Sequence, residues 1–239
     1  HRPNAPPPGA ASPQPDARAA LETLTRHLAL IAVITGRAAA NGRGKVGLDG
    51  LVYVGNHGFE RWIDGVVQIA PEAEAARPAL EAVITALEPH LLPGMFIEDK
   101  RATLSIHYRA AADPAAAEAV FAPLVAQCSA AHALAHFAGH RLYEVRPRAS
   151  IDKGTALASL IADHRIGAAV WLGDDVTDAD AMRAARALRA DGRCAAYGLG
   201  VTSANTPRAV LDAADALLPG TDGVAAWLVA LADGISTTV

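Results

Sequence analysis

The sequence predicts an α/β protein, a doubly wound parallel sheet (Rossmann-like) into which a smaller α+β domain is inserted. Near both ends of the chain, unbroken apolar runs alternate with segments of helical periodicity, as strands buried on both faces alternate with their connecting helices. In the middle, apolar and polar residues alternate, which is typical of a half-exposed antiparallel sheet. We therefore assign residues 1–66 and 147–239 to the core and residues 67–146 to the inserted domain.

The first part of the core begins with a proline-rich segment. Residues 1–15 hold six prolines, which favour an extended chain. Asp16 is a suitable N-cap for a helix that continues to about residue 27. The apolar run 29–34 predicts a buried strand. A glycine-rich segment at 41–50 predicts a loop, and residues 51–54 predict a second strand that ends in a small polar cluster.

The inserted domain is predicted from four segments. Residues 71–90 place Leu, Val and Ile on one helical face, and residues 114–132 predict a second helix. Alternation over residues 96–109 and again over residues 142–147 predicts antiparallel strands.

The core then resumes with the same alternation of helix and strand. A helix is expected over residues 153–164 and a buried strand over 168–172. The next helix runs from 178 to about 192, a strand follows at 194–201, and residues 222–231 predict the last helix.

Composition narrows the possible classes of protein. The chain has 239 residues, of which 51% are hydrophobic and 19% are charged, which suffices for one large or two small domains. A net charge of −4 argues against nucleic acid as a partner. Cys128 and Cys194 are too few for a disulfide framework. No apolar run reaches the roughly 20 residues of a membrane span, and no signal peptide is apparent, so we expect a cytoplasmic protein without a membrane partner.

Two adjacent aspartates follow the predicted strand 168–172. Asp174 and Asp175 would be costly at the end of a buried strand unless positive charge lies nearby, and a divalent ion with oxygen ligands is a natural partner. Asp178, at the start of the next helix, can order the loop by capping. The alternative is an acidic loop that only caps the helix.

Two further residues have the chemistry of an anion site. Lys153 precedes Gly154 at a predicted helix start, where it adds positive charge to a site already suited to anions. The alternative is a solvated surface lysine. Thr35 follows the strand 29–34 and offers a hydroxyl and backbone N–H groups to a phosphate oxygen, although an ordinary turn is an alternative.

The order of these groups resembles a known superfamily. The sequence has a hydroxyl after one strand, then a lysine at a helix start, then an aspartate pair after another strand. This order resembles that of motifs two, three and four of haloacid dehalogenase-type phosphatases. Over about residues 15–231 the chain resembles trehalose-6-phosphate phosphatases more narrowly. The motifs that carry this resemblance are Val33-Ile-Thr-Gly-Arg37, Gly55-Asn-His-Gly58, Glu98-Asp-Lys100, His107-Tyr-Arg109, Tyr143-Glu-Val-Arg-Pro147, Lys153-Gly154 and Gly173-Asp-Asp-Val-Thr-Asp178.

The resemblance implies a role for each matching core residue. Thr35 would hold the transferring phosphoryl group, and Lys153 would neutralise its charge and orient the nucleophile. Asp174 would bind Mg²⁺, with Asp175 ligating it directly or through water. The inserted domain would be a cap over the site.

The resemblance also implies which residues contact the sugar phosphate. These are Arg37, Asn56, His57, Gly58, Glu98, Lys100, Arg109 and Glu144. Positions 98 and 100 share one face of a strand, but such a face is also commonly charged without binding anything. His57 has a structural role as its alternative, and Glu144 could orient Lys153, reach the sugar, or simply point outward.

One family motif has no counterpart here. The family's Asp-x-Asp-Gly-Thr carries the attacking aspartate and the general acid/base, and no such run occurs before Thr35. His1-Arg-Pro and the prolines after it resemble the segment that lies just beyond that motif in the family. We therefore expect the motif, on a strand at the centre of the sheet, to precede His1 in the natural protein, with genuine loss of the motif as the alternative.

The resemblance implies Mg²⁺-dependent hydrolysis of trehalose 6-phosphate to trehalose and phosphate. A related phosphatase acting on sucrose phosphate or a mannosyl-phosphoglycerate is one alternative. Another is a catalytically inactive domain that binds a sugar phosphate or a protein partner such as a trehalose-phosphate synthase.

Overall fold

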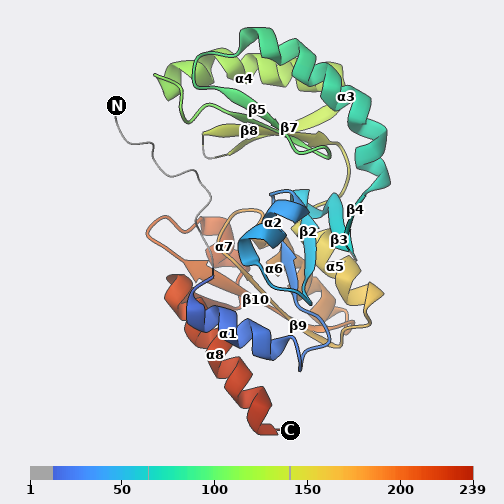
Figure 1. The fold of residues 1–239 in the computed structure, drawn as a ribbon, viewed down its shortest axis with the longest axis vertical. Coiled ribbons are helices and arrows are strands. Elements are labelled where there is room, and N and C mark those ends of the chain that lie inside the picture. Colours follow the sequence, from blue (N-terminus) through green and yellow to red (C-terminus); the bar gives the residue numbers. More distant parts are fainter. Residues whose placement is uncertain (1–12, 64, 140, 239) are drawn as a thin grey trace. The chain divides into compact units, whose positions relative to one another are not determined.

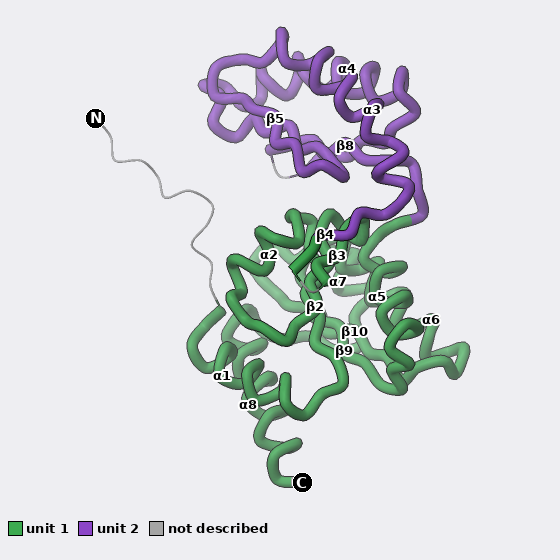
Figure 2. The backbone as a smooth tube through the Cα atoms, turned by 45° about the vertical axis from the view of Figure 1, so that its right-hand side comes forward, with its two compact units in different colours: residues 1–66, 151–239 green, residues 67–150 purple. Residues whose placement is uncertain are grey.

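The computed structural model describes residues 13–63, 65–139 and 141–238. The chain forms two compact units (Figure 2). One unit is formed by residues 1–66 and 151–239, the other by residues 67–150. The chain returns to the first unit at Ile151, whereas the sequence pattern placed this return at residue 147. Each unit has its own hydrophobic core.

The first unit contains a sheet that begins with two parallel strands. β1 (Ala32–Ile34) pairs in parallel with β2 (Val52–Gly55), and β3 (Glu60–Ile63) is antiparallel to β2. β4 (Val66–Ile69) follows β3 in the sheet order, and the chain passes from the first unit to the second within it.

A second sheet of the same unit is wholly parallel. It has the order β11-β10-β9, from β9 (Ala168–Gly173), β10 (Ala195–Thr202) and β11 (Ala216–Pro219). A parallel α/β architecture is therefore confirmed, as the alternation of apolar runs and helical segments predicted.

Among the described residues the parallel strands form two sheets, because β1 and β9 do not pair with each other. The Val52 N–H donates to Ile31 O, and the Thr35 N–H donates to Val54 O. The backbone groups of alternate residues of β1 therefore face β2. The backbone groups of Ala32 and Ile34 therefore turn to the other edge. In β9, the Ala195 N–H of β10 donates to Gly167 O, so every second residue from 167 faces β10. The N–H and C=O of Val170 therefore point away from β10.

One helix of the first unit packs against strands of both sheets. α5 (Lys153–Asp163) contributes Leu160 to a cluster with Ala32 and Ile34 of β1. It also contributes Leu157 to the cluster around Trp171 of β9, against which Ile34 packs as well. The facing edges of β1 and β9 thus share a helix, and the carboxyl ends of both strands carry predicted site residues.

The other helices of the first unit cover the sheets (Figure 1). α1 and α8 pack on one another through Ala20, Leu24 and Ala232, and α6 packs on β9 and β10. The bounds are α1 Pro15–Leu24, α2 Ala39–Val46, α6 Asp178–Ala190, α7 Arg208–Ala213 and α8 Gly220–Thr238. A 3₁₀ turn, Asn56–Gly58, follows β2.

The second unit is a four-stranded antiparallel sheet with two helices. The sheet order is β5-β6-β8-β7, and Leu104 and Ile106 of β6 join Leu80 of α3 and Phe121 of α4 in one core. The bounds are α3 Pro71–Leu87, the 3₁₀ turn Glu88–His90, β5 Phe96–Asp99, β6 Leu104–His107, α4 Pro114–Ala131, β7 Leu134–Gly139 and β8 Leu142–Pro147. The predicted half-exposed sheet is thus present, with its apolar face on the helices.

Some local expectations were wrong. The glycine-rich segment 41–50 is largely helical: α2 extends to Val46 and ends at Gly47, which has a left-handed φ of 63°. Gly42 is buried there, and a Cβ at this position would lie 3.2 Å from the Thr35 methyl group. Packing on the neighbouring loop therefore overrides the low helix propensity of glycine. The last helix also continues beyond residue 231 to Thr238.

Asp215 ties β11 to its neighbours, and its replacement gives a test of the fold. Its carboxylate accepts hydrogen bonds from Arg189 Nη2 at 2.6 Å and from the Gly198 N–H at 2.8 Å. The hydrogen bonds from Arg189 hold the pKa of Asp215 below its usual range. Asp215→Asn should lower the free energy of unfolding at pH 7 by about 1–3 kcal/mol.

The effect should depend on pH, because a carboxyl group with a lowered folded-state pKa stabilises only while it is ionised. The difference between wild type and Asp215→Asn should be full above the unfolded-state pKa of about 4 and shrink as the pH falls through the lower folded-state value. Urea unfolding at pH 7 and pH 3 measures it. Asp212→Asn, which breaks an exposed pair with Arg208, is the control. An equal difference at both pH values would contradict this account.

Candidate active site

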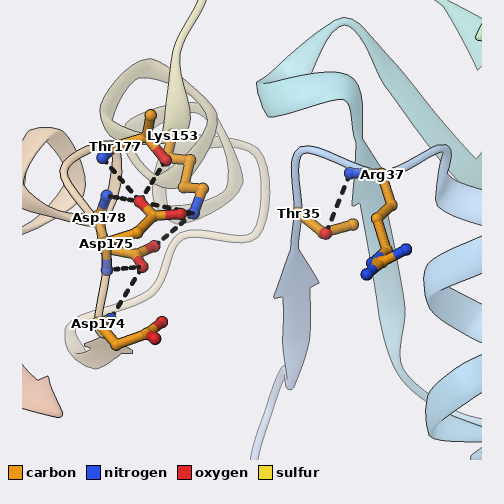
Figure 3. A network of polar contacts seen from close by, with 7 residues as sticks. All are labelled: Thr35, Arg37, Lys153, Asp174, Asp175, Thr177 and Asp178. Carbon is orange, nitrogen blue, oxygen red and sulfur yellow. Dashed lines mark hydrogen bonds and ion pairs between the residues drawn. The ribbon is translucent and has the colours of Figure 1, made fainter. Parts of the chain in front are cut away.

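The first part of the candidate site is a pair of loops held together by backbone hydrogen bonds. The loop after β1 carries Thr35 and Arg37, and the turn after β2 carries Asn56 and His57. The His57 N–H donates to Thr35 O at 2.9 Å, and the Asn56 N–H donates to Arg37 O at 2.8 Å. The Arg37 N–H donates to Thr35 Oγ1 at 3.2 Å (Figure 3). The predicted phosphate-binding threonine thus lies in an ordered turn beside its neighbouring strand.

The close approach of these loops depends on Gly36. A Cβ at Gly36 would lie 2.5 Å from His57 Nε2, closer than any real contact. His57 is 7% exposed, and both it and Asn56 adopt left-handed backbone angles, with φ of 59° and 49°. Such angles are unfavourable for residues other than glycine, so the surrounding contacts must stabilise the turn.

The second part of the site is the aspartate loop after β9, which is organised by Asp178. Asp178 is 5% exposed, and its Oδ2 accepts the N–H groups of Asp174 at 2.9 Å and Asp175 at 3.0 Å. A Cβ at Gly173 would lie 2.2 Å from Asp178 Cγ, so only glycine leaves room for this carboxylate. From the sequence we expected only a capping role for Asp178, because the Asp-Asp-x-x-Asp spacing does not predict that its side chain is buried.

The two predicted metal ligands differ in what they already bind. Asp175 Oδ1 accepts from Thr177 N–H at 2.7 Å, from Thr177 Oγ1 at 2.6 Å and from Asp178 N–H at 3.0 Å. The Asp174 side chain is exposed and makes no hydrogen bond to any residue that the structure describes. Asp174 is thus the carboxylate of this loop that remains open to a further partner.

Lys153 joins the aspartate loop from the start of α5. Its Nζ lies 2.7 Å from Asp178 Oδ1 and 3.4 Å from Asp175 Oδ2, and its side chain is 6% exposed (Figure 3). The helix start is fixed by Asp152, whose side chain accepts the Thr155 N–H in a capping box. The alternative of a solvated surface lysine is therefore excluded by its burial.

The buried charges shift one another's titration. Burial raises the pKa of Asp178, and the neighbouring Asp175 raises it further against the opposing effect of Lys153. Burial also opposes ionisation of Asp175, but Lys153 and the hydrogen bonds from Thr177 outweigh it and lower the pKa of Asp175. The Lys153 ammonium group is thus directed at two carboxylates whose pKa values are shifted in opposite directions.

Four of the eight residues predicted to contact the sugar phosphate lie in the second unit: Glu98, Lys100, Arg109 and Glu144. The register Glu98↔Ser105↔Glu144 places both glutamates on the sheet face that carries no helices. Lys100 Nζ lies 3.6 Å from Glu144 Oε1. Arg109 is exposed just beyond β6.

His107 also lies among these residues, although it was not predicted as a site residue. His107 Nε2 lies 3.0 Å from Glu98 Oε2, and its ring stacks on Phe96 with centroids 4.5 Å apart. Its position two residues before Arg109, inside a motif that resembles the family, was the available signal.

The structure therefore brings the predicted residues together in groups. Thr35, Arg37, Asn56, His57 and Gly58 form one loop pair, and Lys153, Asp174 and Asp175 form one loop cluster in the same unit. Glu98, Lys100 and Glu144 share a sheet face of the other unit. No group of three or more potential metal ligands occurs among the described residues, and no helix in that part of the chain is long and apolar enough to cross a membrane.

Comparison with solved structures supports the fold. A structure described as a trehalose-6-phosphate phosphatase related protein matches with a TM-score of 0.77 at 16% identity, over 99% of this chain and 95% of that one. The C-terminal domain of Candida albicans trehalose-6-phosphate phosphatase matches with a TM-score of 0.76 at 24% identity, over 96% of this chain and 88% of that one. At these identities the likeness concerns the fold alone.

Sequence comparison carries the relationship further. The trehalose-phosphate phosphatase of Mycobacterium leprae is 36% identical over 191 residues, which are 75% of this chain and 44% of that protein. The Mycobacterium tuberculosis (strain H37Rv) protein of the same name is 38% identical over 184 residues, 73% of this chain and 46% of that protein. The chain thus spans less than half the length of these relatives. The trehalose-phosphatase family model matches residues 2–203, and the chain belongs to this family.

Proposed function

We propose that this protein takes part in trehalose biosynthesis in the cytoplasm as a Mg²⁺-dependent phosphomonoesterase that hydrolyses trehalose 6-phosphate to trehalose and phosphate. The observation that carries the proposal is the buried Lys153, held by Asp178 and Asp175 at the carboxyl end of a parallel strand. In open α/β sheets, ligands bind at this end of the strands. Membership of the trehalose-phosphatase family supplies the substrate class.

The loop after β1 is proposed to bind the phosphoryl group. Thr35 would donate its hydroxyl to a phosphoryl oxygen, and Arg37 and the Asn56–Gly58 turn would bind the remaining oxygens and the adjoining sugar. Lys153 would stabilise the negative charge that develops on phosphoryl transfer, because a desolvated ammonium group interacts strongly with an oxyanion. Asp178 would hold that ammonium group in place, at 2.7 Å from its Oδ1.

The residues present fit a magnesium ion in part. Asp174 offers a carboxylate that binds no described residue, and Mg²⁺ in phosphoryl-transfer sites is held by one or two carboxylates together with substrate phosphate and water. We propose Asp174 as a direct ligand and Asp175 as a ligand through water, because Asp175 Oδ1 already accepts hydrogen bonds from Thr177, Asp178 and Lys153. When bound, the ion would neutralise charge on the phosphate.

The attacking group is proposed to lie between the two sheets. No described strand pairs with the outer edge of β1 or of β9. Both strands pack on α5, and their carboxyl ends lead to Thr35 and Asp174. A parallel strand placed between these edges would bring a carboxylate at its own carboxyl end between the phosphate loop and Lys153. This is the place at which an Asp-x-Asp-Gly-Thr strand would supply the nucleophile and the general acid/base.

Sugar recognition is proposed for the open sheet face of the second unit. Glu98, Lys100, Glu144 and Arg109 would hydrogen-bond sugar hydroxyls there, and the unit would act as a cap that excludes bulk water. The same open sheet face would also suit one second candidate function, a domain that binds the sugar phosphate without hydrolysing it. A trehalose-phosphate synthase would be the partner of such a domain.

The role of Lys153 can be tested by removing its charge. In the full natural protein, Lys153→Met should lower kcat for trehalose 6-phosphate by about 10²–10³-fold, the usual cost of losing one transition-state charge contact. Lys45→Met is the matched control and should leave kcat within twofold. The double variant Lys153→Met/Asp178→Asn removes both buried charges. If the loss reflected only an unpaired Asp178, the double variant would recover activity, which would contradict the proposed role.

The role of the open sheet face can be separated from the chemistry by a substrate without a sugar. Glu98→Gln and Lys100→Met should each raise KM for trehalose 6-phosphate by about tenfold, the effect of losing one hydrogen bond to a charged group. Hydrolysis of p-nitrophenyl phosphate should not change. Glu72→Gln, on the exposed side of α3, is the control. Equal losses on both substrates would show that these residues support the fold or the chemistry rather than the sugar.

A further inference from the structure

The open sheet face of the second unit brings three side chains of two strands together. Phe96 and Glu98 lie two residues apart on β5 and therefore on the same face. His107 of β6 is directly opposite Phe96 in the antiparallel register, and Glu98 is opposite Ser105. His107 is thus the diagonal cross-strand neighbour of Glu98, at a separation that long side chains can span.

Two contacts fix the ring of His107. Its Nε2 lies 3.0 Å from Glu98 Oε2, and its plane stacks on the Phe96 ring with centroids 4.5 Å apart and an angle of 16° between the planes. The ring is therefore held on its face by Phe96 and at its edge by the carboxylate. The His107 side chain is 21% exposed and that of Glu98 is 46% exposed, so the histidine is the more enclosed partner of the two.

The direction of the hydrogen bond follows from the chemistry of the two groups. An ionised carboxylate only accepts hydrogen bonds, so His107 Nε2 carries the hydrogen. A neutral imidazole with its proton on Nε2 and an imidazolium both provide this N–H, so the contact does not depend on the charge of the ring. Glu98 Oε1 makes no hydrogen bond to any residue that the structure describes. Glu98 thus presents one open acceptor oxygen while its other oxygen is held.

The second glutamate of this face is held in a different way. The Glu144 side chain is 17% exposed, and its Oε1 lies 3.6 Å from Lys100 Nζ. Glu98 is the more exposed carboxylate, and a long exposed side chain has much rotamer freedom to lose when it is ordered. A ligand that binds such a side chain is held more weakly by this loss, unless the protein has already ordered the side chain.

We propose that His107 is a positioning residue for sugar recognition, which orders Glu98 before the substrate binds and leaves its Oε1 directed at a sugar hydroxyl group. The proposal rests on the sugar-binding role proposed above for this sheet face. Phe96 supports the arrangement by stacking on the imidazole ring. His107 acts through Glu98, so loss of its hydrogen bond weakens sugar binding and leaves the phosphoryl chemistry unchanged.

Two substitutions separate the hydrogen bond from the stacking contact. His107→Phe keeps a flat ring beside Phe96 but removes the donor, whereas His107→Gln removes the ring but keeps an N–H donor near the position of Nε2. In the full natural protein, His107→Phe should raise KM for trehalose 6-phosphate about fivefold, the effect of having to order one flexible side chain. The kcat value and the hydrolysis of p-nitrophenyl phosphate should not change.

His107→Gln should keep KM within twofold of the wild-type value. The matched control is His136→Phe, at an exposed position on the edge strand β7 of the same sheet, and it should also change KM by less than twofold. The opposite order, with His107→Gln harmful and His107→Phe harmless, would show that only the stacking contact matters and would overturn the proposal.

A double-mutant cycle tests whether His107 acts through Glu98. In a Glu98→Ala background, His107→Phe should change KM by less than twofold, because no carboxylate remains to be positioned. A fivefold effect that persists in this background would overturn the proposal and leave the proposed function intact. An unchanged KM in Glu98→Ala alone would refute the sugar-binding role of the sheet face, and the proposal with it.

A measurement without substrate tests the ordering of Glu98 directly. In NMR spectra of the unsubstituted chain, the two γ-methylene protons of Glu98 should give separate signals, as in a side chain held in one rotamer. In His107→Phe these signals should move toward a common average, while the backbone amide spectrum shows that the variant is folded. Averaged signals in the unsubstituted chain would overturn the proposal, because Glu98 would then not be ordered before binding.

Discussion

The buried ion pair between Lys153 and Asp178 is the interaction on which the arrangement of the site depends. Two charged side chains that are each less than a tenth exposed would be costly alone, and at 2.7 Å each compensates the other. Asp178 also accepts the N–H groups of Asp174 and Asp175, so one carboxylate fixes both the lysine and the loop. Because Asp178 fixes the backbone of the loop, the Asp174 side chain is not needed for this and binds no described residue. The absence of a side chain at Gly173 makes this possible.

The two sheets of the first unit are related to each other through α5. β1 and β9 end in Thr35 and in the aspartate loop, and α5 packs on both strands while presenting Lys153 at its first position. A hydroxyl, an ammonium group and carboxylates therefore come from three elements of one unit. The proposed strand between β1 and β9 would form hydrogen bonds with the outward backbone groups of both edges. It would also supply the proposed nucleophile and general acid/base.

Much of this was predictable from sequence because the signals were local. Unbroken apolar runs located β2 and β9, and alternation located β6 and β8. Polar residues directly after apolar strands located Thr35 and Asp174. The parts that failed depend on contacts distant in sequence. α2 forms through glycines that allow close packing on the Thr35 loop, and β7, which was not predicted, is an edge strand with one buried residue, Leu134.

The roles within the aspartate loop were equally hidden from the sequence. Asp174, Asp175 and Asp178 have identical side chains, so the sequence does not distinguish their roles. Burial and hydrogen bonding distinguish Asp178, which fixes the loop, from the exposed Asp174. The pairing of Glu98 with His107 also required the register of β5 and β6, since these residues are nine positions apart.

We propose that Thr35, Lys153 and the aspartate loop bind the substrate and stabilise charge in hydrolysis of trehalose 6-phosphate. The most direct measurement is phosphate release by the full natural protein from trehalose 6-phosphate, sucrose 6-phosphate and glucose 6-phosphate, with Mg²⁺ and then with a chelator. The account predicts release from trehalose 6-phosphate that exceeds the other two by at least tenfold and stops when the chelator is added. Equal rates on all three sugars, or release that the chelator leaves unchanged, would contradict it.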